Sequence, residues 1–371
     1  MNATCALTLH RVEVASLRCH TTASWECAPG MNLIVGENGC GKTTLLEAAY
    51  IMAHGRSFRQ ARDPQLVQWG EKRFHVSGRW TRFGPLYVNV EGSRGRTSIS
   101  LQGKPVRTRK DLEETLPVLV DAPQSRKVVD GVPNERRRWL DGMMTACSDT
   151  AAAHYRNYLR CLMQRSRLLR SGSRSSIDIW EAQLVSHGMA IVAERRRLID
   201  ALNNHLAGEE SLVEGPFRLE LPSSAPDEQE TWLAALHASR AEDARFGRLR
   251  IGPHCDRLKM IYHDREIRSS GSRGQQRLAG MALLLAESEL RVQHRGLIPV
   301  LLLDDCLEAL DRSRQHRLLA RMEKSRAQIL MTAPNTMSLP KGADIEVQVH
   351  ELKRGPQQSE QTYIPEAEEA I

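Results

Sequence analysis

The chain has 371 residues, of which 41% are hydrophobic, enough for one large α/β domain with an insertion or for two to three smaller domains. Its 52 Lys and Arg exceed its 45 Asp and Glu, and the resulting net charge of +7 suits a nucleic acid or another anionic partner. Eight cysteines without a C-x-x-C pair suggest neither a zinc ribbon nor a disulfide framework. No stretch approaches the ~18 apolar residues of a membrane helix, so we expect a cytoplasmic protein with no membrane partner.

The first hundred residues predict strands and one helix. Alternation of apolar and polar residues favours strands at 6–14, 73–80, 86–90 and 97–101. Turn-forming residues at 83–85 and 91–93 are predicted to bound the third of these strands. This part of the chain therefore has an antiparallel character.

Residues 36–43, with the sequence G-E-N-G-C-G-K-T, match the phosphate-binding loop G-x-x-x-x-G-K-[ST]. The apolar run 31–35 predicts a buried strand before the loop, and residues 44–53 predict a helix after it, which is the context that the motif requires. Glycines let the backbone turn tightly and present N–H groups to phosphate oxygens, and the helix N-terminus adds positive potential. We therefore expect the chain to bind a nucleoside triphosphate.

The side chains of this loop have separate tasks. Lys42 is expected to reach the β- and γ-phosphates as a catalytic residue, and the Thr43 hydroxyl is expected to ligate Mg²⁺. ATP and Mg²⁺ are thus the implied cofactors. The predicted nucleotide contacts are Gly36, Glu37, Asn38, Gly39, Cys40, Gly41, Lys42, Thr43 and Thr44.

The middle of the chain has helical periodicity. A helical region opens at 134–141, and apolar residues recur at helical spacing over 155–169 and 177–202. The Ser- and Gly-rich segment 171–176 between the last two predicts a helical hairpin or a short coiled-coil arm. The polar, Pro-containing segment 221–230 is predicted to be a loop.

An α/β pattern returns from about residue 248. Buried strands are predicted at 258–262, 300–303 and 328–331, with helices at 275–290 and 314–324. The phosphate-binding loop and this terminal half are expected to share one sheet. The predicted domains are a discontinuous head, 1–130 with 245–371, and an inserted helical lobe at 131–244.

The strand at 300–303 ends on two acids, Asp304 and Asp305. Paired carboxylates at the end of a buried strand are costly for stability, because like charges repel and burial removes their hydration. Beside Mg²⁺–ATP they have a use. We assign Asp304 to the metal and Asp305, as the catalytic residue, to the attacking water; the alternative is a solvated strand end.

Residues Ser272, Arg273, Gly274 and Gln275 precede the long helix predicted at 275–290. Alone they predict only a serine–glycine turn that caps a helix. Their order in the chain is more informative: phosphate-binding loop, helical insertion, S-R-G-Q, acidic strand, then Leu310-Asp311. This order resembles the ABC-type ATPases, in which such a signature completes the ATP site of a second subunit.

Several segments resemble the RecF family of bacterial DNA replication and repair proteins. They are residues 54–59 (H-G-R-S-F-R), 135–141 (E-R-R-R-W-L-D), 252–254 (G-P-H), 272–276 (S-R-G-Q-Q) and 302–305 (L-L-D-D). The resemblance implies an α/β fold, an ABC-type P-loop ATPase head with mixed and antiparallel sheets and an inserted α-helical lobe. Such heads are related to those of SMC and Rad50 proteins but lack the long coiled coils.

The same resemblance implies a mode of action. Two copies would dimerise head to head around ATP, bind double-stranded DNA and gapped single-strand/double-strand junctions, and hydrolyse ATP slowly. Together with RecO and RecR they would help to load RecA at gaps.

Some positions depart from the family pattern. Asp305 stands where most ABC proteins have glutamate, which fits slow hydrolysis. Gln124 lies near the expected Q-loop, a position that contacts nucleotide and Mg²⁺, and Thr332 lies nearest the place of a switch histidine. Gly271 replaces the leucine of the signature, and His254 has no assigned role.

Basic residues supply candidate contacts for DNA phosphates. The candidates are Arg56, Arg59, Arg136, Arg137 and Arg138, with further clusters at 107–110 and 165–170. The alternative for each cluster is a solvated helix face, and 136–138 can instead pair with acids. No helix-turn-helix or zinc finger is evident, so any DNA binding is expected to be independent of sequence.

Three other functions fit a phosphate-binding loop. An ATPase module of an anti-phage system requires a C-terminal nuclease domain, and a transporter subunit usually carries a switch histidine. A small-molecule P-loop kinase explains neither the signature nor the helical insertion.

Overall fold

The computed structural model describes residues 5–59, 63–93, 96–123, 127–172, 176–308, 310–335 and 346–353. The chain forms two compact units, Met1–Ser125 with Leu297–Ile371, and Arg126–Gly296. The predicted helical lobe ended at 244, whereas the second unit extends to 296. The difference arises because the long helix α11 (Arg273–Arg295) packs on the helices α5 (Pro133–Cys147) and α7 (Ile177–Ala207) of this unit.

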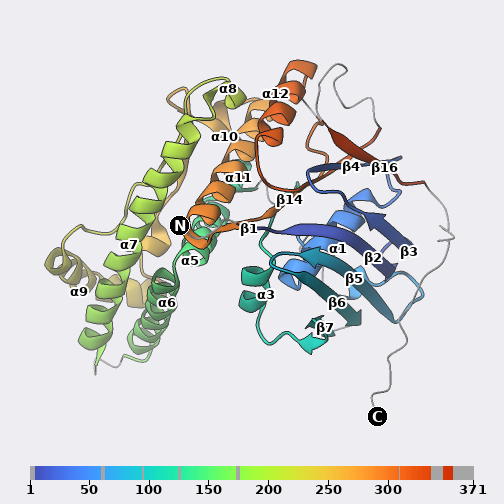
Figure 1. Cartoon of the computed structure of the whole chain (residues 1–371). Helices are drawn as coiled ribbons and strands as arrows, with labels where there is room; N and C mark the ends of the chain where they lie inside the picture. Colours follow the sequence, from blue (N-terminus) through green and yellow to red (C-terminus); the bar gives the residue numbers. More distant parts are fainter. Residues whose placement is uncertain are drawn as a thin grey trace, which may run out of the picture. The chain divides into compact units, whose positions relative to one another are not determined.

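A parallel sheet carries the phosphate-binding loop in the first unit (Figure 1). Its strand order is β16 (Val347–Glu351), β4 (Met31–Val35), β15 (Ile329–Ala333), β14 (Val300–Leu303) and β9 (Val118–Asp121). The three central strands are buried throughout, as continuous apolar runs predict for a parallel sheet. The predicted strands at 31–35, 300–303 and 328–331 therefore do share one sheet.

An antiparallel sheet forms the other half of this unit. Its order is β3 (His20–Glu26), β2 (Thr8–Leu17), β5 (Arg73–Thr81), β6 (Pro85–Ser93), β7 (Arg96–Leu101) and β8 (Lys104–Pro105). The predicted turn at 91–93 is wrong, because these residues belong to β6 and pair with β7. Gly92 instead serves packing, since a Cβ there would lie 2.1 Å from Cε1 of Phe74.

Helix α1 (Lys42–His54) packs against strands of both sheets. Its residues Leu45, Leu46, Ala48, Ala49 and Met52 are fully buried in the shared core. Burying a leucine side chain contributes about 1.5–3 kcal/mol, so this contact fixes the helix whose N-terminus faces the phosphate-binding loop. Short elements complete the unit: β1 (Cys5–Ala6), β13 (Leu297–Ile298), α2 (Asp63–Leu66), α3 (Arg109–Thr115) and α12 (Arg312–Glu323).

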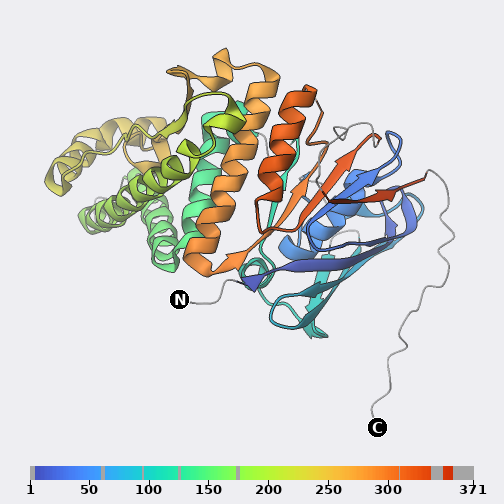
Figure 2. The same ribbon diagram turned by 45° about the horizontal axis from the view of Figure 1, so that its top comes forward.

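The second unit is mainly helical (Figure 2). Besides α5, α7 and α11 it contains α4 (Lys127–Asp130), α6 (Asp149–Arg170), α8 (Glu210–Val213), α9 (Gln229–Phe246) and α10 (Ile267–Ser270). Helices α6 and α7 pack side by side, which confirms the predicted hairpin. The predicted strand at 258–262 does not join the sheet of the phosphate-binding loop. It is β11 (Lys259–Tyr262), which pairs with β10 (Phe217–Glu220) and β12 (Arg265–Glu266).

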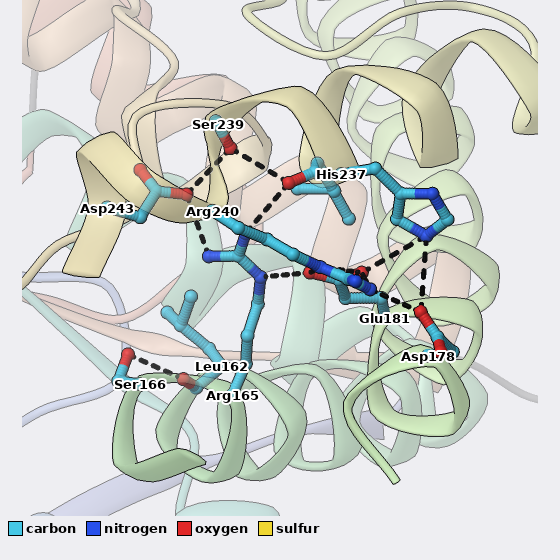
Figure 3. A network of polar contacts seen from close by, with 10 residues as sticks. Leu162, Arg165, Ser166, Asp178, Glu181, His237, Ser239, Arg240 and Asp243 are labelled. Carbon is cyan, nitrogen blue, oxygen red and sulfur yellow. Dashed lines mark hydrogen bonds and ion pairs between the residues drawn. The ribbon is translucent and has the colours of Figure 1, made fainter. Parts of the chain in front are cut away.

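Ion pairs connect three helices of this unit (Figure 3). Arg165 of α6 donates to Glu181 of α7 and to Asp243 of α9, both at 2.8 Å, and is 1% exposed. Arg240 of α9 donates to Glu181 and Asp178 of α7. Arg165 therefore stabilises the unit and is not available to DNA, whereas Arg167 and Arg170 of the same predicted cluster are exposed.

Candidate nucleotide site

The phosphate-binding loop has the backbone that its glycines predicted. It joins β4 to α1, and Gly39 and Gly41 adopt φ values of +84° and +103°, which favour glycine. Gly41 caps the helix, and its carbonyl accepts from Thr44 N–H at 2.8 Å. A Cβ on Gly41 would also lie 2.1 Å from Nε2 of His20, so a larger residue would displace the His20 ring as well.

Lys42 folds back over the loop. Its Nζ donates to the carbonyl oxygens of Gly36 at 2.6 Å and Glu37 at 3.0 Å, and the side chain is buried. An ammonium group has three donors. The arrangement holds the charge at the centre of the loop and leaves one N–H for a phosphate oxygen.

Two threonines organise the acids at the end of β14. The hydroxyls of Thr43 and Thr332 donate to Oδ1 of Asp304 at 2.8 and 2.9 Å. The Thr332 hydroxyl also accepts from the backbone N–H of Asp305 at 2.9 Å, where Asp305 adopts a φ of +49°. Thr332, at the predicted switch position, thus couples the two acids to each other.

The pair Thr43–Asp304 fits Mg²⁺. The ion prefers oxygen ligands at about 2.0–2.1 Å in an octahedron, so adjacent ligands lie about 2.9 Å apart. The two oxygens are 2.8 Å apart in the structure. Both groups can therefore become neighbouring ligands with little movement.

A cavity of about 530 Å³ adjoins the loop. Ligand pockets commonly measure about 300–1,000 Å³, so a nucleotide fits. Predicted residues that line it are Asn38, Gly39, Gly41, Lys42, Thr43, Thr44, Arg59 and Asp305. The structure thus brings Asp305 to the phosphate-binding loop. It also places Arg59, predicted to contact DNA, at the nucleotide cavity.

Four further cavity residues were not predicted: Arg18, Cys19, Glu308 and Pro334. Arg18, in the tip between β2 and β3, is held by Glu47, with Nε–Oε2 at 2.5 Å and Nη2–Oε1 at 2.8 Å. Glu47 is fully buried and also accepts from Ser57 of the G-R-S-F-R segment. No motif marks a hairpin tip, so only the folded arrangement of β2, β3 and α1 identifies Arg18 and Cys19 as cavity residues.

Cys19 and His20 form an acid–base pair at the edge of the cavity. The hydrogen bond with His20 lowers the pKa of Cys19, although burial opposes this shift. Burial alone lowers the pKa of His20, but the hydrogen bond and charge of Cys19 outweigh burial and raise it. The His20 ring also lies 3.2 Å from the carbonyl oxygen of Gly41. Charge at this pair therefore acts directly on the phosphate-binding loop.

The signature segment lies in the second unit and forms a complete helix cap. The Ser272 hydroxyl accepts from Gln275 N–H at 3.3 Å, and Gln275 Oε1 accepts from Ser272 N–H at 2.8 Å. This confirms the predicted capped turn. Ser272 and Arg273 are exposed and Gly274 is buried. Gln124, the predicted Q-loop residue, lies outside the described residues.

Comparison with known proteins agrees with this fold. A family model described as the RecF/RecN/SMC N terminal domain matches residues 8–355. "DNA replication and repair protein RecF" of Heliobacterium modesticaldum is 31% identical over 342 residues, covering 87% of this chain and 91% of the relative. The chain belongs to the RecF family.

A second RecF, from Moorella thermoacetica, is 33% identical over 328 residues, covering 85% of this chain and 86% of its own length. Two solved structures show the same fold. One, described as the recombination mediator protein RecF-ATP in the RecFOR pathway, has a TM-score of 0.80 at 24% identity and covers 95% of this chain and 98% of its own. An Smc head from Pyrococcus furiosus has a TM-score of 0.56 at 15% identity, covering 90% and 91%. The predicted fold class is thereby confirmed, and a RecF-family chain is neither a transporter subunit nor a small-molecule kinase.

The arginines of the E-R-R-R-W-L-D segment differ in their surroundings. Arg136 is 2% exposed and donates to Glu266 at 2.6 Å and to the carbonyl of Leu258 at 3.2 Å. It is therefore a structural residue and not a DNA contact. Arg138 and Arg56 are exposed, and Arg137 is half-buried. Among the described helices, none is both long and apolar enough to cross a membrane.

Proposed function

We propose that this RecF-family chain is an ATP-gated DNA-binding protein of recombinational repair. ATP binds in the cavity beside the phosphate-binding loop, and two copies then close around two ATP molecules and hold double-stranded DNA near gaps. One observation carries the proposal. Thr43 and Thr332 both donate to Asp304, Thr332 links Asp304 to Asp305, and Thr43 and Asp305 line one cavity.

The residues of this cavity divide the work on ATP. Loop N–H groups and Lys42 bind the phosphates, and Thr43 and Asp304 hold Mg²⁺, which supplies charge neutralisation to the triphosphate. Asp305 orients the attacking water. Its N–H bond to Thr332 fixes its backbone, and its side chain is shorter than the glutamate of most ABC proteins, so we expect slow hydrolysis that times release.

A second copy supplies the other half of the site. Ser272 and Arg273 are exposed at the N-terminus of α11, a 23-residue helix whose dipole favours an anion. This surface fits the γ-phosphate held by the partner. ATP therefore acts first as a bridge between copies and only later as a substrate.

DNA and protein partners follow from the family and from charge. The net charge of +7 and the exposed Arg56 and Arg138 suit a phosphate backbone. A similar solved protein is described as a recombination mediator in the RecFOR pathway. We accordingly expect RecR and RecO as partners in loading RecA at single-strand/double-strand junctions.

Light scattering with and without ATP tests the composite site. The wild type should dimerise with ATP, whereas Lys42→Ala and Ser272→Arg should both remain monomeric. Asn157→Arg, which places the same arginine side chain at an exposed position of α6, serves as a control and should still dimerise. Monomers under all conditions would contradict the proposal.

Titration of duplex DNA at several salt concentrations tests the DNA-binding part. Affinity should rise with ATP and fall steeply with salt, because each phosphate contact releases about one counterion. Affinity that does not respond to ATP would exclude gating by nucleotide.

A further inference from the structure

A second pocket, of about 150 Å³, lies wholly within the helical unit. Helix α5 contributes Asn134, Arg137 and Arg138 to its wall, α6 contributes Tyr155, and α7 contributes Arg195. These residues belong to the E-R-R-R-W-L-D segment or pack against it. The nucleotide site uses none of them.

Arg195 balances part of the negative charge near this pocket. Arg195 is 1% exposed and donates to Asp141 at 2.5 Å and to Asp256 at 2.9 Å. The Tyr155 hydroxyl donates to the other oxygen of Asp141 at 3.0 Å. Burial, followed by the charge of Asp141, raises the pKa of Tyr155 to about 12, so the phenol keeps its proton. One guanidinium thus offsets one of the two carboxylate charges, and Asp141 and Asp256 together keep one negative charge.

His254 adds no charge. Its Nε2 lies 3.0 Å from the carbonyl oxygen of Leu249, which can only accept, so this nitrogen carries the proton. Nδ1 then accepts from the Tyr158 hydroxyl at 2.6 Å. Burial lowers the pKa of His254, in keeping with a neutral ring. The histidine of the G-P-H segment is thus a structural support for the pocket wall.

The charges of Arg137 and Arg138 outweigh this one negative charge, and both side chains have donors to spare. Arg137 donates one N–H to the backbone carbonyl of Asp256 at 2.7 Å, and a guanidinium has five donors. Within the described ranges, neither Arg137 nor Arg138 forms an ion pair with a carboxylate. The Nε–H of Arg195 is buried and has no hydrogen-bond partner among the described residues.

We propose that this pocket is an oxyanion site that binds one phosphate group, supplied by a DNA backbone or by free phosphate. Arg137 and Arg138 both line the pocket, and guanidinium groups suit tetrahedral oxyanions. The pocket is too small for a nucleotide, since sites for such ligands start at about 300 Å³. The assignment of this phosphate to DNA rests on the proposed function, whereas phosphate binding by the pocket does not.

A thermal-shift titration with inorganic phosphate tests the site. The full chain carries Lys42→Ala, which weakens phosphate binding at the phosphate-binding loop. Chloride at equal ionic strength is the reference. Phosphate should raise the midpoint temperature of this parent. Arg137→Gln and Arg138→Gln should weaken the response at least tenfold, a loss on the order of one charge-assisted hydrogen bond. Arg156→Gln, which removes one exposed arginine of α6 outside the pocket, should keep the response.

Two results would overturn the assignment: no response to phosphate in the parent, or an equal response to acetate. Each variant is first compared with the parent in chloride, where an unchanged midpoint shows that the fold is intact. If Arg138→Gln alone fails this comparison, Arg138→Lys, which keeps the charge but loses the fork, should retain the fold and still lose most of the response.

Duplex DNA binding with ATP, measured without Lys42→Ala, identifies the source. If DNA supplies the phosphate, Arg138→Gln weakens binding more than Arg156→Gln does and reduces the salt slope by about one. If Arg138→Gln and Arg156→Gln change DNA affinity equally, and only Arg138→Gln loses the thermal response to phosphate, the site binds free phosphate. If the wild type does not bind DNA at all, the proposed function is wrong. The phosphate titration still shows whether the pocket binds phosphate.

Discussion

Two polar centres of this chain use carboxylates in opposite ways. In the helical unit, Glu181 accepts from Arg165 at 2.8 Å and from Arg240, and Asp243 accepts from Arg165 (Figure 3). At the nucleotide site, the hydroxyls of Thr43 and Thr332 hold Asp304. A hydroxyl orients a carboxylate without neutralising its charge, whereas a guanidinium does both. The first centre is therefore built for stability and the second for binding a cation.

The same comparison decides how to interpret a second group of metal-ligand types. Asp178, Glu181 and His237 offer ligand atoms within 4.8 Å of one another. Distance alone fits a metal ion, but Arg240 donates to both carboxylates and would have to be displaced. We therefore assign this group to ion pairing between α7 and α9.

Arg165→Met should have the largest effect on stability. Removing one partner of a buried ion pair costs about 3–5 kcal/mol, because the other charge is left uncompensated. Chemical denaturation should show this loss, and ATP affinity of the remaining folded protein should stay within about twofold. Arg167→Met on the exposed face of α6 is the matched control and should change stability by less than about 0.5 kcal/mol. If Arg165→Met and Arg167→Met have equal free energies of unfolding, the ion pairs of the helical unit do not serve stability as proposed.

Lys42→Ala should have the opposite effect: it should lose ATP affinity and keep stability. The phosphates lose the ammonium group, so ATP affinity should fall by about 100-fold, or 2.7 kcal/mol, on the scale of a charged hydrogen bond. Without nucleotide the stability should change little, since Lys42 bonds only to loop carbonyls in the described structure. Fluorescent-nucleotide titration measures the affinity, and Lys259→Ala, at an exposed position of β11, is the control. Retained affinity in Lys42→Ala would show that the cavity is not the ATP site.

Local patterns predicted the elements of the nucleotide site but not all of its residues. The run 31–35, the G-x-x-x-x-G-K-T loop and the acids after 300–303 each carry their signal within a few neighbouring residues. Arg18, Cys19 and His20 reach the loop only because β2, β3 and α1 pack together, which no local pattern encodes. The strand at 258–262 was predicted correctly, yet its partner β10 lies about forty residues earlier, and sheet membership depends on that distant pairing. The glycine at position 92 favours a turn in sequence analysis, but in the fold it lies within a strand, where the absence of a side chain makes room for Phe74.

Thr332→Val tests whether the hydroxyl between the two acids matters for hydrolysis. Valine has a similar shape but cannot donate to Asp304 or accept from Asp305 N–H. The maximal ATPase rate should fall about tenfold, equivalent to one hydrogen bond of about 1.4 kcal/mol. ATP affinity should change by less than threefold, because Lys42 and the loop are untouched. Thr332→Ser restores the hydroxyl and should restore the rate; a slow Thr332→Ser would instead point to altered packing of β15.

The smallest effect concerns the pH dependence of Cys19. Since its folded pKa is lowered from the ordinary value of 9.0, the thiolate persists to lower pH than in the unfolded chain. Iodoacetamide should therefore alkylate Cys19 of the native protein with a rate midpoint below pH 9.0, measured without Mg²⁺ and read by mass spectrometry of the labelled peptide. His20→Asn removes the main cause of the lowered pKa and should move the midpoint upward.

ATP should protect Cys19 from alkylation, because the thiol lines the nucleotide cavity. Cys147, whose pKa burial raises to about 11, is the internal control and should remain unlabelled. If neither His20→Asn nor ATP changes the alkylation rate of Cys19, the β2–β3 hairpin is not part of the nucleotide site.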